Sequence, residues 1–299
     1  MKMLQKDILN TPLPIVSTGR IERLENIRSD YVSSRHIDVW LPEGYPSRGK
    51  YAVLYMNDGQ MLFDSATTWN GQSWGVAETV GELSSTGKIR NCIVVAIWNS
   101  GGNRHSDYFP QKPFEHLPAA YRESLKEAKR EDGTTLFPIA IRSDDYLKFI
   151  TKELKPFIDC RYATLPDLAS TFIAGSSMGG MISIYAVCEY PEIFCGAACM
   201  STHWLGIFTE KNNPIPDAFF SYLYQSLPSP KDHRFYFDYG TETLDAFYAP
   251  YQLKVDQIMI SKGYTSKNWQ TRKFIGEEHS EYAWRKRLHI PITFLLRVE

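Results

Sequence analysis

The pentapeptide Gly175–Gly179 places the strongest constraint on how this chain can fold. It follows the pattern G-x-S-x-G, with Ser177 at its centre. A short apolar run, Thr171–Ala174, leads into it, and a helix-compatible stretch, Met178–Tyr190, leads out. A strand, a sharp turn and a helix in this order hold a serine hydroxyl clear of a sheet, and so tight a turn requires small neighbours. We therefore predict a strand–turn–helix unit with Ser177 as a candidate nucleophile. The alternative is a glycine-rich turn without chemistry.

Strand-like and helix-like segments alternate along the chain. The patterns typical of strands lie at Ser34–Leu41, Tyr51–Met56, Cys92–Trp98, Thr171–Ala174, Phe194–Met200, Arg234–Tyr239 and Asn268–Ile275. The helical patterns lie at Ser143–Ile158, Met178–Tyr190, Tyr251–Lys262 and Ser280–Leu296. In the last of these, Pro291 should kink or break the helix. The alternation predicts an α/β fold, in which a mainly parallel central sheet carries helices on both faces.

One long segment, Asn99–Ile141, interrupts this alternation. It is rich in glycine and proline and holds only one short helix-like piece, around Ala119–Arg130. Long insertions between a strand and a helix are usually functional. We expect this insertion to lie over the active-site edge of the sheet, as a lid or pocket loop; a solvated decoration is the alternative. Since the sequence contains no repeat or convincing linker, we expect residues 1–299 to form a single domain.

The composition narrows the classes of partner. The formal net charge is −1, which disfavours nucleic acid and anionic membrane surfaces. No stretch approaches the roughly 18 apolar residues of a membrane span, and Met1–Val16 lacks the apolar core of a signal peptide. We therefore expect a cytoplasmic protein without a membrane partner. The five cysteines form no regular framework and predict reduced, mostly buried thiols. No metal-ligand pattern is present, so we expect neither a metal nor a cofactor, and nothing in the sequence predicts an oligomeric state.

A nucleophilic serine needs a base, usually a histidine. In folds built on a turn of this kind, the order along the chain is serine, acid, histidine. Of the seven histidines, His279 fits this order best, because it follows the predicted strand Asn268–Ile275 through a short loop. Such a loop can deliver a base to the edge of the sheet. The alternative is a surface histidine beside Glu277 and Glu278.

The acid that would orient this base is expected in the loop after the strand Arg234–Tyr239. Both Glu242 and Asp245 lie there. We favour Asp245, because it comes closer to the start of the next helix, and retain Glu242 as the alternative.

Two backbone N–H groups should stabilise an oxyanion in such a site. One belongs to the residue after the nucleophile, and the other comes from the loop after an earlier strand. These requirements indicate Met178 and Gln60, the latter directly after Gly59, which lets the backbone turn sharply.

Six motifs in the correct order resemble one family of proteins. They are Tyr55–Gln60, Arg104–Pro110, Phe149–Arg161, Gly175–Gly180, Tyr239–Glu242 and Gly276–Glu281. The chain resembles the putative-esterase group of α/β-hydrolases, which includes esterase D, enterochelin esterases and feruloyl esterases. The resemblance implies an α/β-hydrolase fold and a Ser-His-acid hydrolase without a metal, with Ser177 as nucleophile, His279 as base, and Gln60 and Met178 as oxyanion donors.

The same resemblance implies contacts with a substrate. Arg104 matches a family arginine near the pocket, and we expect it to contact a polar group, with Trp204 as a further pocket residue. A solvated arginine and a tryptophan packed in the core are the alternatives.

We therefore expect a serine carboxylic ester hydrolase that acts on a small-molecule ester through an acyl-enzyme. One alternative is a ferric-siderophore esterase of the enterochelin type, which the lack of an obvious basic cluster disfavours. Another is a non-catalytic binding protein of the same fold. This alternative is disfavoured because a serine, candidate acids and a histidine are all present in the expected order.

Overall fold

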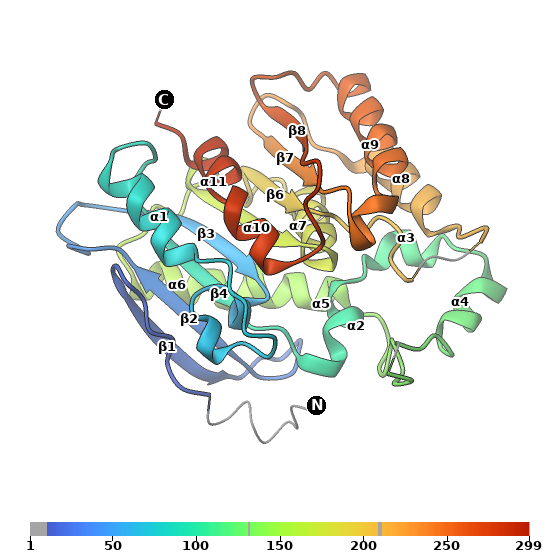
Figure 1. The fold of residues 1–299 in the computed structure, drawn as a ribbon, viewed down its shortest axis with the longest axis horizontal. Coiled ribbons are helices and arrows are strands. Elements are labelled where there is room, and N and C mark those ends of the chain that lie inside the picture. The colour runs from blue at the N-terminus through green and yellow to red at the C-terminus, as the bar shows by residue number, and fades with distance from the viewer. Residues whose placement is uncertain (1–10, 131, 209–210, 299) are drawn as a thin grey trace.

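The computed structural model describes residues 11–130, 132–208 and 211–298. Among them, eight strands form one sheet in the order β1-β2-β4-β3-β5-β6-β7-β8 (Figure 1). The strands are β1 (Arg20–Ile27), β2 (Arg35–Leu41), β3 (Ala52–Asn57), β4 (Cys92–Ile97), β5 (Thr171–Ser176), β6 (Gly196–Met200), β7 (Arg234–Tyr239) and β8 (Trp269–Lys273). Every predicted strand is present, within two residues at either end. The prediction missed β1, an edge strand that mixes charged and apolar residues.

The sheet is mainly parallel, as predicted. Within the series β4, β3, β5, β6, β7 and β8, each strand pairs in parallel with the next. Strands β1 and β2 form an antiparallel pair, and β2 joins β4 antiparallel. The carboxyl ends of the parallel strands therefore lie at one edge, where ligands of open α/β sheets bind.

Helices cover both faces of the sheet (Figure 1). They are α1 (Val76–Ser85), α2 (Arg104–Tyr108), α3 (Gln111–Glu115), α4 (Ala119–Leu125), α5 (Ser143–Lys148), α6 (Lys155–Arg161), α7 (Met178–Glu189), α8 (Ile215–Ser226), α9 (Ala249–Ser261), α10 (Glu281–Arg287) and α11 (His289–Leu296). The sequence prediction missed α1, α2, α3 and α8. The helix predicted at Ser143–Ile158 is present as α5 and α6, joined by a π-helical segment, Phe149–Leu154. The last predicted helix is broken, as expected, but the break falls at Leu288 and leaves Pro291 in the first turn of α11.

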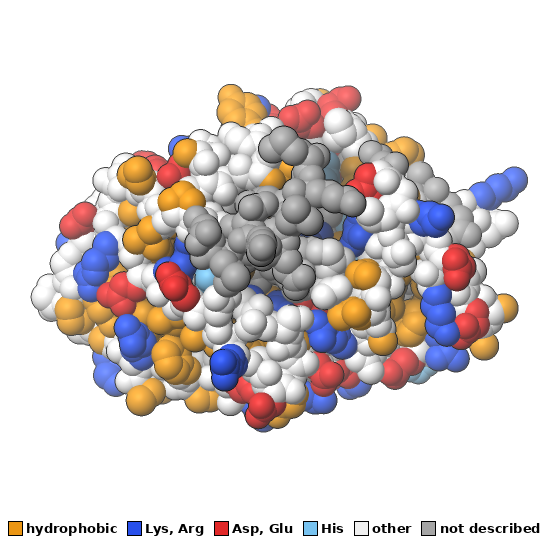
Figure 2. Space-filling model, turned by 90° about the horizontal axis from the view of Figure 1, so that it is seen from below, with side chains coloured by type: hydrophobic (Ala, Val, Ile, Leu, Met, Phe, Trp, Pro, Cys, Tyr) orange, Lys and Arg blue, Asp and Glu red, His pale blue; other side chains and the backbone are white. Residues whose placement is uncertain are grey.

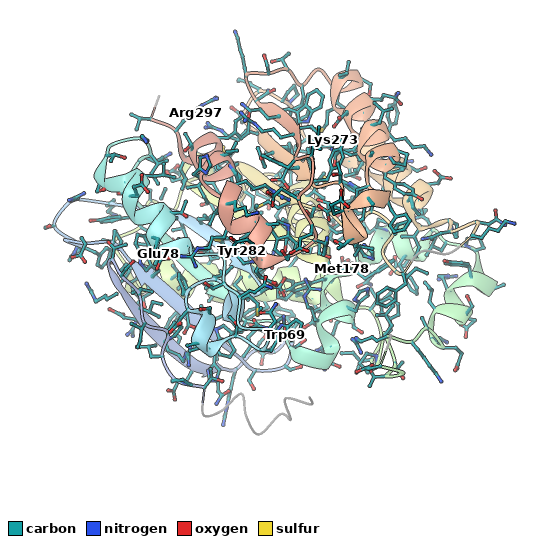
Figure 3. All side chains as sticks on the ribbon, viewed as in Figure 1. Trp69, Glu78, Met178, Lys273, Tyr282 and Arg297 are labelled. Atoms are coloured by element: carbon teal, nitrogen blue, oxygen red, sulfur yellow. The ribbon has the colours of Figure 1, made fainter. Side chains whose placement is uncertain are left out.

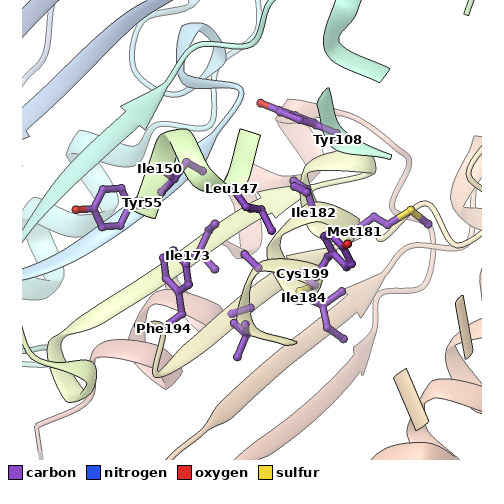
Figure 4. Close-up of a cluster of buried hydrophobic side chains, with 14 of the residues drawn as sticks. Tyr55, Tyr108, Leu147, Ile150, Ile173, Met181, Ile182, Ile184, Phe194 and Cys199 are labelled. Carbon is purple, nitrogen blue, oxygen red and sulfur yellow. The ribbon is translucent and has the colours of Figure 1, made fainter. Parts of the chain in front are cut away.

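Two apolar cores lie on opposite faces of the sheet. Along β3, Val53 and Tyr55 belong to one core and Leu54 and Met56 to the other, because successive strand side chains point to opposite faces. Figure 4 shows part of the first core, where side chains of α7 pack against Ile173 of β5. Burial on both faces explains why the central strands are continuously apolar.

The insertion between β4 and α5 is tied to the body of the protein. It contains α2, α3 and α4. Asp107 of α2 is fully buried and binds Arg35 of β2 at 3.0 Å and Arg142 at 2.9 Å. This pairing fixes the first part of the insertion beside the carboxyl end of β4.

The burial of the cysteines and the mixed charge of the surface agree with what the composition predicts. None of the five cysteines forms a disulfide in the described structure, and four of them are buried. On the face seen in Figure 2, basic and acidic side chains are interspersed. Among the residues described, no helix combines the length and apolar character that crossing a membrane requires.

Candidate active site

The turn that carries Ser177 has the predicted strand–turn–helix geometry. Ser177 lies between β5 and α7 with φ 56° and ψ −124°, a conformation that costs energy for a residue with a side chain. A Cβ on Gly175 would lie 2.5 Å from the Gly179 carbonyl oxygen, so position 175 requires glycine. The Ser177 N–H donates to the Met200 carbonyl at 2.9 Å, which anchors the turn to β6.

The structure brings His279 and Asp245 together. His279 lies on the loop between β8 and α10, and Asp245 lies in a 3-10 turn, Thr243–Phe247, after β7. Nδ1 of His279 is 2.5 Å from Oδ1 of Asp245, and the His279 N–H donates to Thr243 Oγ1 at 2.9 Å. With the carboxylate ionised, Nδ1 carries the proton and Nε2 is free to accept one.

Glu242, the alternative acid, points elsewhere. Its side chain is exposed and accepts a hydrogen bond from the neighbouring Thr241 hydroxyl at 3.3 Å. Geometry therefore favours Asp245 as the partner of His279.

The second oxygen of Asp245 is held by a buried network. Oδ2 accepts from Ser201 Oγ and from the Gly240 N–H, each at 2.6 Å. Burial by itself raises the pKa of the Asp245 carboxyl. The bonds and charge from His279, Ser201 and Gly240 outweigh burial and leave this pKa below its ordinary value. Asp245 is therefore ionised at neutral pH.

Ser201 is the centre of this network. Its hydroxyl donates to Asp245 and accepts from Trp284 Nε1 at 2.9 Å and Arg287 Nη2 at 3.0 Å, which uses its one proton and both lone pairs. Arg287 also pairs with buried Asp238 at 3.0 Å. Sequence reasoning missed Ser201, Trp284 and Arg287 as site residues. Two sequence signals could have indicated them: Ser201 is a polar residue directly after β6, and Trp284 and Arg287 are three positions apart on one face of α10.

The loops that carry Asp245 and His279 are joined backbone to backbone. The Glu277 carbonyl accepts from the N–H groups of Thr241 at 2.9 Å and Glu242 at 3.1 Å. A Cβ on Gly240 would lie 2.0 Å from that same carbonyl oxygen, so only glycine permits this approach.

Ser177 and His279 line one cleft of about 600 Å³ at the carboxyl edge of the sheet. The other lining residues are Asp58, Met61, Trp69, Asn70, Gln72, Trp74, Asn99, Arg104, Ser176, Glu278, Ser280, Glu281 and Trp284. The insertion contributes Asn99 and Arg104. Trp204 is absent from this lining: it is 1% exposed, donates to Gln252 Oε1 at 3.1 Å and packs against phenylalanine rings of the core.

The two predicted oxyanion donors lie on neighbouring segments. Met178, labelled in Figure 3, begins α7. Gln60 lies in a 3-10 turn after β3, between the cleft residues Asp58 and Met61. A Cβ on Gly179 would lie 3.1 Å from Asp58 Oδ2, so the β3 loop and the first turn of α7 are in contact.

Arg104 is held by a carboxylate of the same cleft. Its Nε and Nη2 donate to the two oxygens of Asp58 at 2.6 and 2.7 Å. Burial opposes the charge of the guanidinium, but Asp58 outweighs it and raises the pKa of Arg104. Asn99 adds a third bond, from Nδ2 to Asp58 Oδ1 at 2.7 Å.

The structure also bears on a metal. Among the described residues, no group of three or more histidine, cysteine, aspartate or glutamate side chains is arranged to hold one.

His203, which follows Ser201 closely in the chain, is a buried histidine outside this lining. It is 4% exposed, and its Nδ1 lies 2.8 Å from the Tyr248 hydroxyl. Burial lowers the pKa of His203 well below its ordinary value, and the charges of His105 and His279 act in the same direction. The folded protein therefore holds His203 neutral.

This burial predicts a loss of stability in acid. Below about pH 6.5 the unfolded chain protonates this histidine and the folded chain does not, so the free energy of unfolding falls as the pH falls. From pH 7 to pH 5 the loss from His203 is expected to be about 2 kcal/mol. Urea unfolding at both pH values should show a smaller loss in His203→Asn than in wild type, by about that amount. An equal loss in the two proteins would contradict the prediction.

Comparison with known proteins identifies the class and then the family. The arrangement of a mainly parallel sheet with helices on both faces is that of the α/β-hydrolases, as predicted. Residues 31–292 match the family model described as "Esterase: Putative esterase", so the chain belongs to this family.

Individual relatives are distant. The uncharacterized protein YjcH of Bacillus subtilis (strain 168) is 24% identical over 156 residues, which are 52% of this chain and 50% of YjcH. The chain thus spans about half the length of the curated relatives it matches.

Solved structures are similar in fold. A ferulic acid esterase superposes with a TM-score of 0.65 at 17% identity. The match covers 93% of this chain and 98% of the esterase chain. The enterobactin esterase FES from Shigella flexneri, solved in the presence of 2,3-di-hydroxy-N-benzoyl-serine, superposes with a TM-score of 0.66 at 15% identity. The match covers 95% of this chain and 61% of FES.

Proposed function

We propose that this protein is a serine hydrolase of small-molecule carboxylic esters that works through an acyl-enzyme. The observation that carries the proposal is one cleft lined by both Ser177, on its strained turn, and His279, whose Nδ1 is bonded to Asp245. Family membership supports the same class of reaction.

In the proposed reaction, Ser177 Oγ attacks the ester carbonyl carbon while His279 Nε2 takes the hydroxyl proton. The oxyanion that forms accepts hydrogen bonds from the N–H groups of Gln60 and Met178. Collapse of this intermediate expels the alcohol, which receives its proton from His279. A water molecule, deprotonated by the same nitrogen, then attacks the acyl-enzyme and releases the acid.

Asp245 is the proposed acid of the triad. Its ionised carboxylate holds the proton on Nδ1 of His279, so that Nε2 faces the serine as an acceptor, and stabilises the imidazolium that forms in the transition state. The bonds from Ser201 and Gly240 fix the carboxylate in this position.

A second candidate function, with the same chemistry, is that of a siderophore esterase. The enterobactin esterase FES has a similar fold. The only arginine or lysine among the described lining residues, Arg104, is already paired with Asp58, which disfavours a ligand with several negative charges. A binding protein without catalysis is the candidate of another class.

A fluorophosphonate probe tests the proposal directly. We expect one probe per protein molecule, attached to Ser177 and located by mass spectrometry of the peptides, because activated serines react with such phosphonylating agents. The Ser176→Ala variant should keep the label, since it leaves the neighbouring hydroxyl in place. Absence of the label, together with no turnover of acetyl, butyryl, octanoyl, feruloyl or siderophore esters, would favour a binding protein.

A further inference from the structure

The cleft around Ser177 is unequally charged. Its described lining residues include three carboxylates, those of Asp58, Glu278 and Glu281, and one guanidinium, that of Arg104. Since Arg104 binds both oxygens of Asp58, these two charges offset each other and present little net charge to a ligand.

The other two carboxylates are bonded to neutral donors among the described contacts, although the negative charge of Glu281 also acts on Arg104 and helps to raise its pKa. Glu278 accepts from the Ser280 hydroxyl at 3.0 Å, and Glu281 accepts from Asn70 Nδ2 at 2.9 Å. Both donors are neutral, and no ion pair of either glutamate is found among the described residues. Because the two glutamates stand on either side of His279 in the chain, their negative field lies beside the proposed reaction centre.

An aromatic surface adjoins these carboxylates. Trp69, labelled in Figure 3 on the connection between β3 and α1, is 73% exposed and lines the same cleft. A tryptophan face attracts an ammonium group that lies over it, through the quadrupole of the ring. Three carboxylates against one guanidinium, beside an exposed indole, are a combination that suits an organic cation.

We propose that the cleft selects esters that carry an ammonium group over neutral esters of the same shape, and neutral esters over anionic ones. This inference rests on the proposed esterase function and names its substrate class. The ammonium group would lie toward Trp69, Glu278 and Glu281, while the ester carbonyl lies at Ser177.

Three esters of one acid test the charge preference. Butyrylcholine is cationic, 3,3-dimethylbutyl butyrate is its neutral isostere, and the butyrate ester of 4-hydroxybutanoate is anionic. We expect kcat/KM to be about tenfold higher for the cation than for the isostere at low ionic strength, and several-fold lower again for the anion. The preference should shrink in about 0.5 M salt, because salt screens charges at the surface.

Matched variants locate the effect. Glu278→Gln and Glu281→Gln should each lower the cation-to-isostere ratio about threefold, and the double variant should bring it close to one. Glu277→Gln is the control, because this carboxylate pairs with Lys286 outside the cleft lining and its loss should leave the ratio unchanged.

Either of two outcomes would overturn the proposal. One is an equal kcat/KM for the neutral isostere and the cation, and the other is a cation-to-isostere ratio that stays unchanged in the double variant. A separate measurement keeps it distinct from the esterase proposal. Calorimetric binding of choline and of 3,3-dimethylbutanol to Ser177→Ala should favour choline, and equal or no binding of both would contradict the charge preference. Absence of serine-dependent turnover of all three esters would instead contradict the esterase function.

Discussion

Replacing Ser177 by alanine is expected to lower kcat/KM for p-nitrophenyl acetate by about five orders of magnitude. The variant keeps the proposed oxyanion donors and the Asp245–His279 pair, so it should retain the small acceleration that binding and electrostatics supply without a nucleophile. It loses the covalent step, because no other serine among the described residues of the cleft lies on a strained turn beside a base. Initial rates of nitrophenol release measure the effect.

The control for this experiment is Ser176→Ala. Ser176 also lines the cleft, but it lies at the end of β5 and has ordinary strand backbone. Its replacement is expected to change kcat/KM by less than about tenfold, with both variants folded by circular dichroism. If Ser177→Ala kept activity within tenfold of wild type, the proposed nucleophile would be wrong.

Replacing Asp245 by asparagine is expected to lower kcat by about 10⁴-fold. An amide in place of the carboxylate no longer fixes the proton on Nδ1 of His279, so Nε2 ceases to be a reliable acceptor for the serine proton. The volume of the side chain is unchanged, which limits the loss of packing. Steady-state kinetics with a saturating short-chain ester give the change in kcat.

Glu242→Gln is the matched test of the alternative acid. Because the Glu242 side chain is exposed and bonded only to its neighbour among the contacts described, we expect its kcat to stay within about twofold of wild type. The opposite result, with Glu242→Gln nearly inactive and Asp245→Asn nearly normal, would make Glu242 the acid.

The parts of the fold that were predictable from the sequence are those with local signals. The turn at Ser177 combines an apolar strand, small residues and a helix within twenty residues, and strand β7 has the predicted bounds. His279 and Asp245 were predicted from chain order, and their hydrogen bond agrees with that order, although their catalytic roles stay predictions.

The parts that were missed depend on contacts between distant segments. Strand β1 is stabilised by pairing with β2, and its own residues alternate too irregularly to indicate a strand. Ser201 and Arg287 are far apart in the chain and meet only where β6 and α10 approach. Trp204 was expected in the pocket, but a tryptophan after a strand is equally suited to the core, and only tertiary packing decides between the two.

The backbone contact between the loops after β7 and β8 gives the segments around the cleft different freedom to change. Asp245 and His279 lie on these two loops, which the Glu277 carbonyl joins by accepting from the N–H groups of Thr241 and Glu242. An inserted or deleted residue in either loop would therefore displace Asp245 and His279 together. Trp69 lies on the connection from β3 to α1, which is tied to α10 through side chains: Gln72 accepts from the Tyr282 N–H, and Asn70 donates to Glu281. Since this connection also carries the proposed oxyanion donor Gln60, new substrate specificity is best sought by changing exposed side chains such as Trp69 and not the length of the connection.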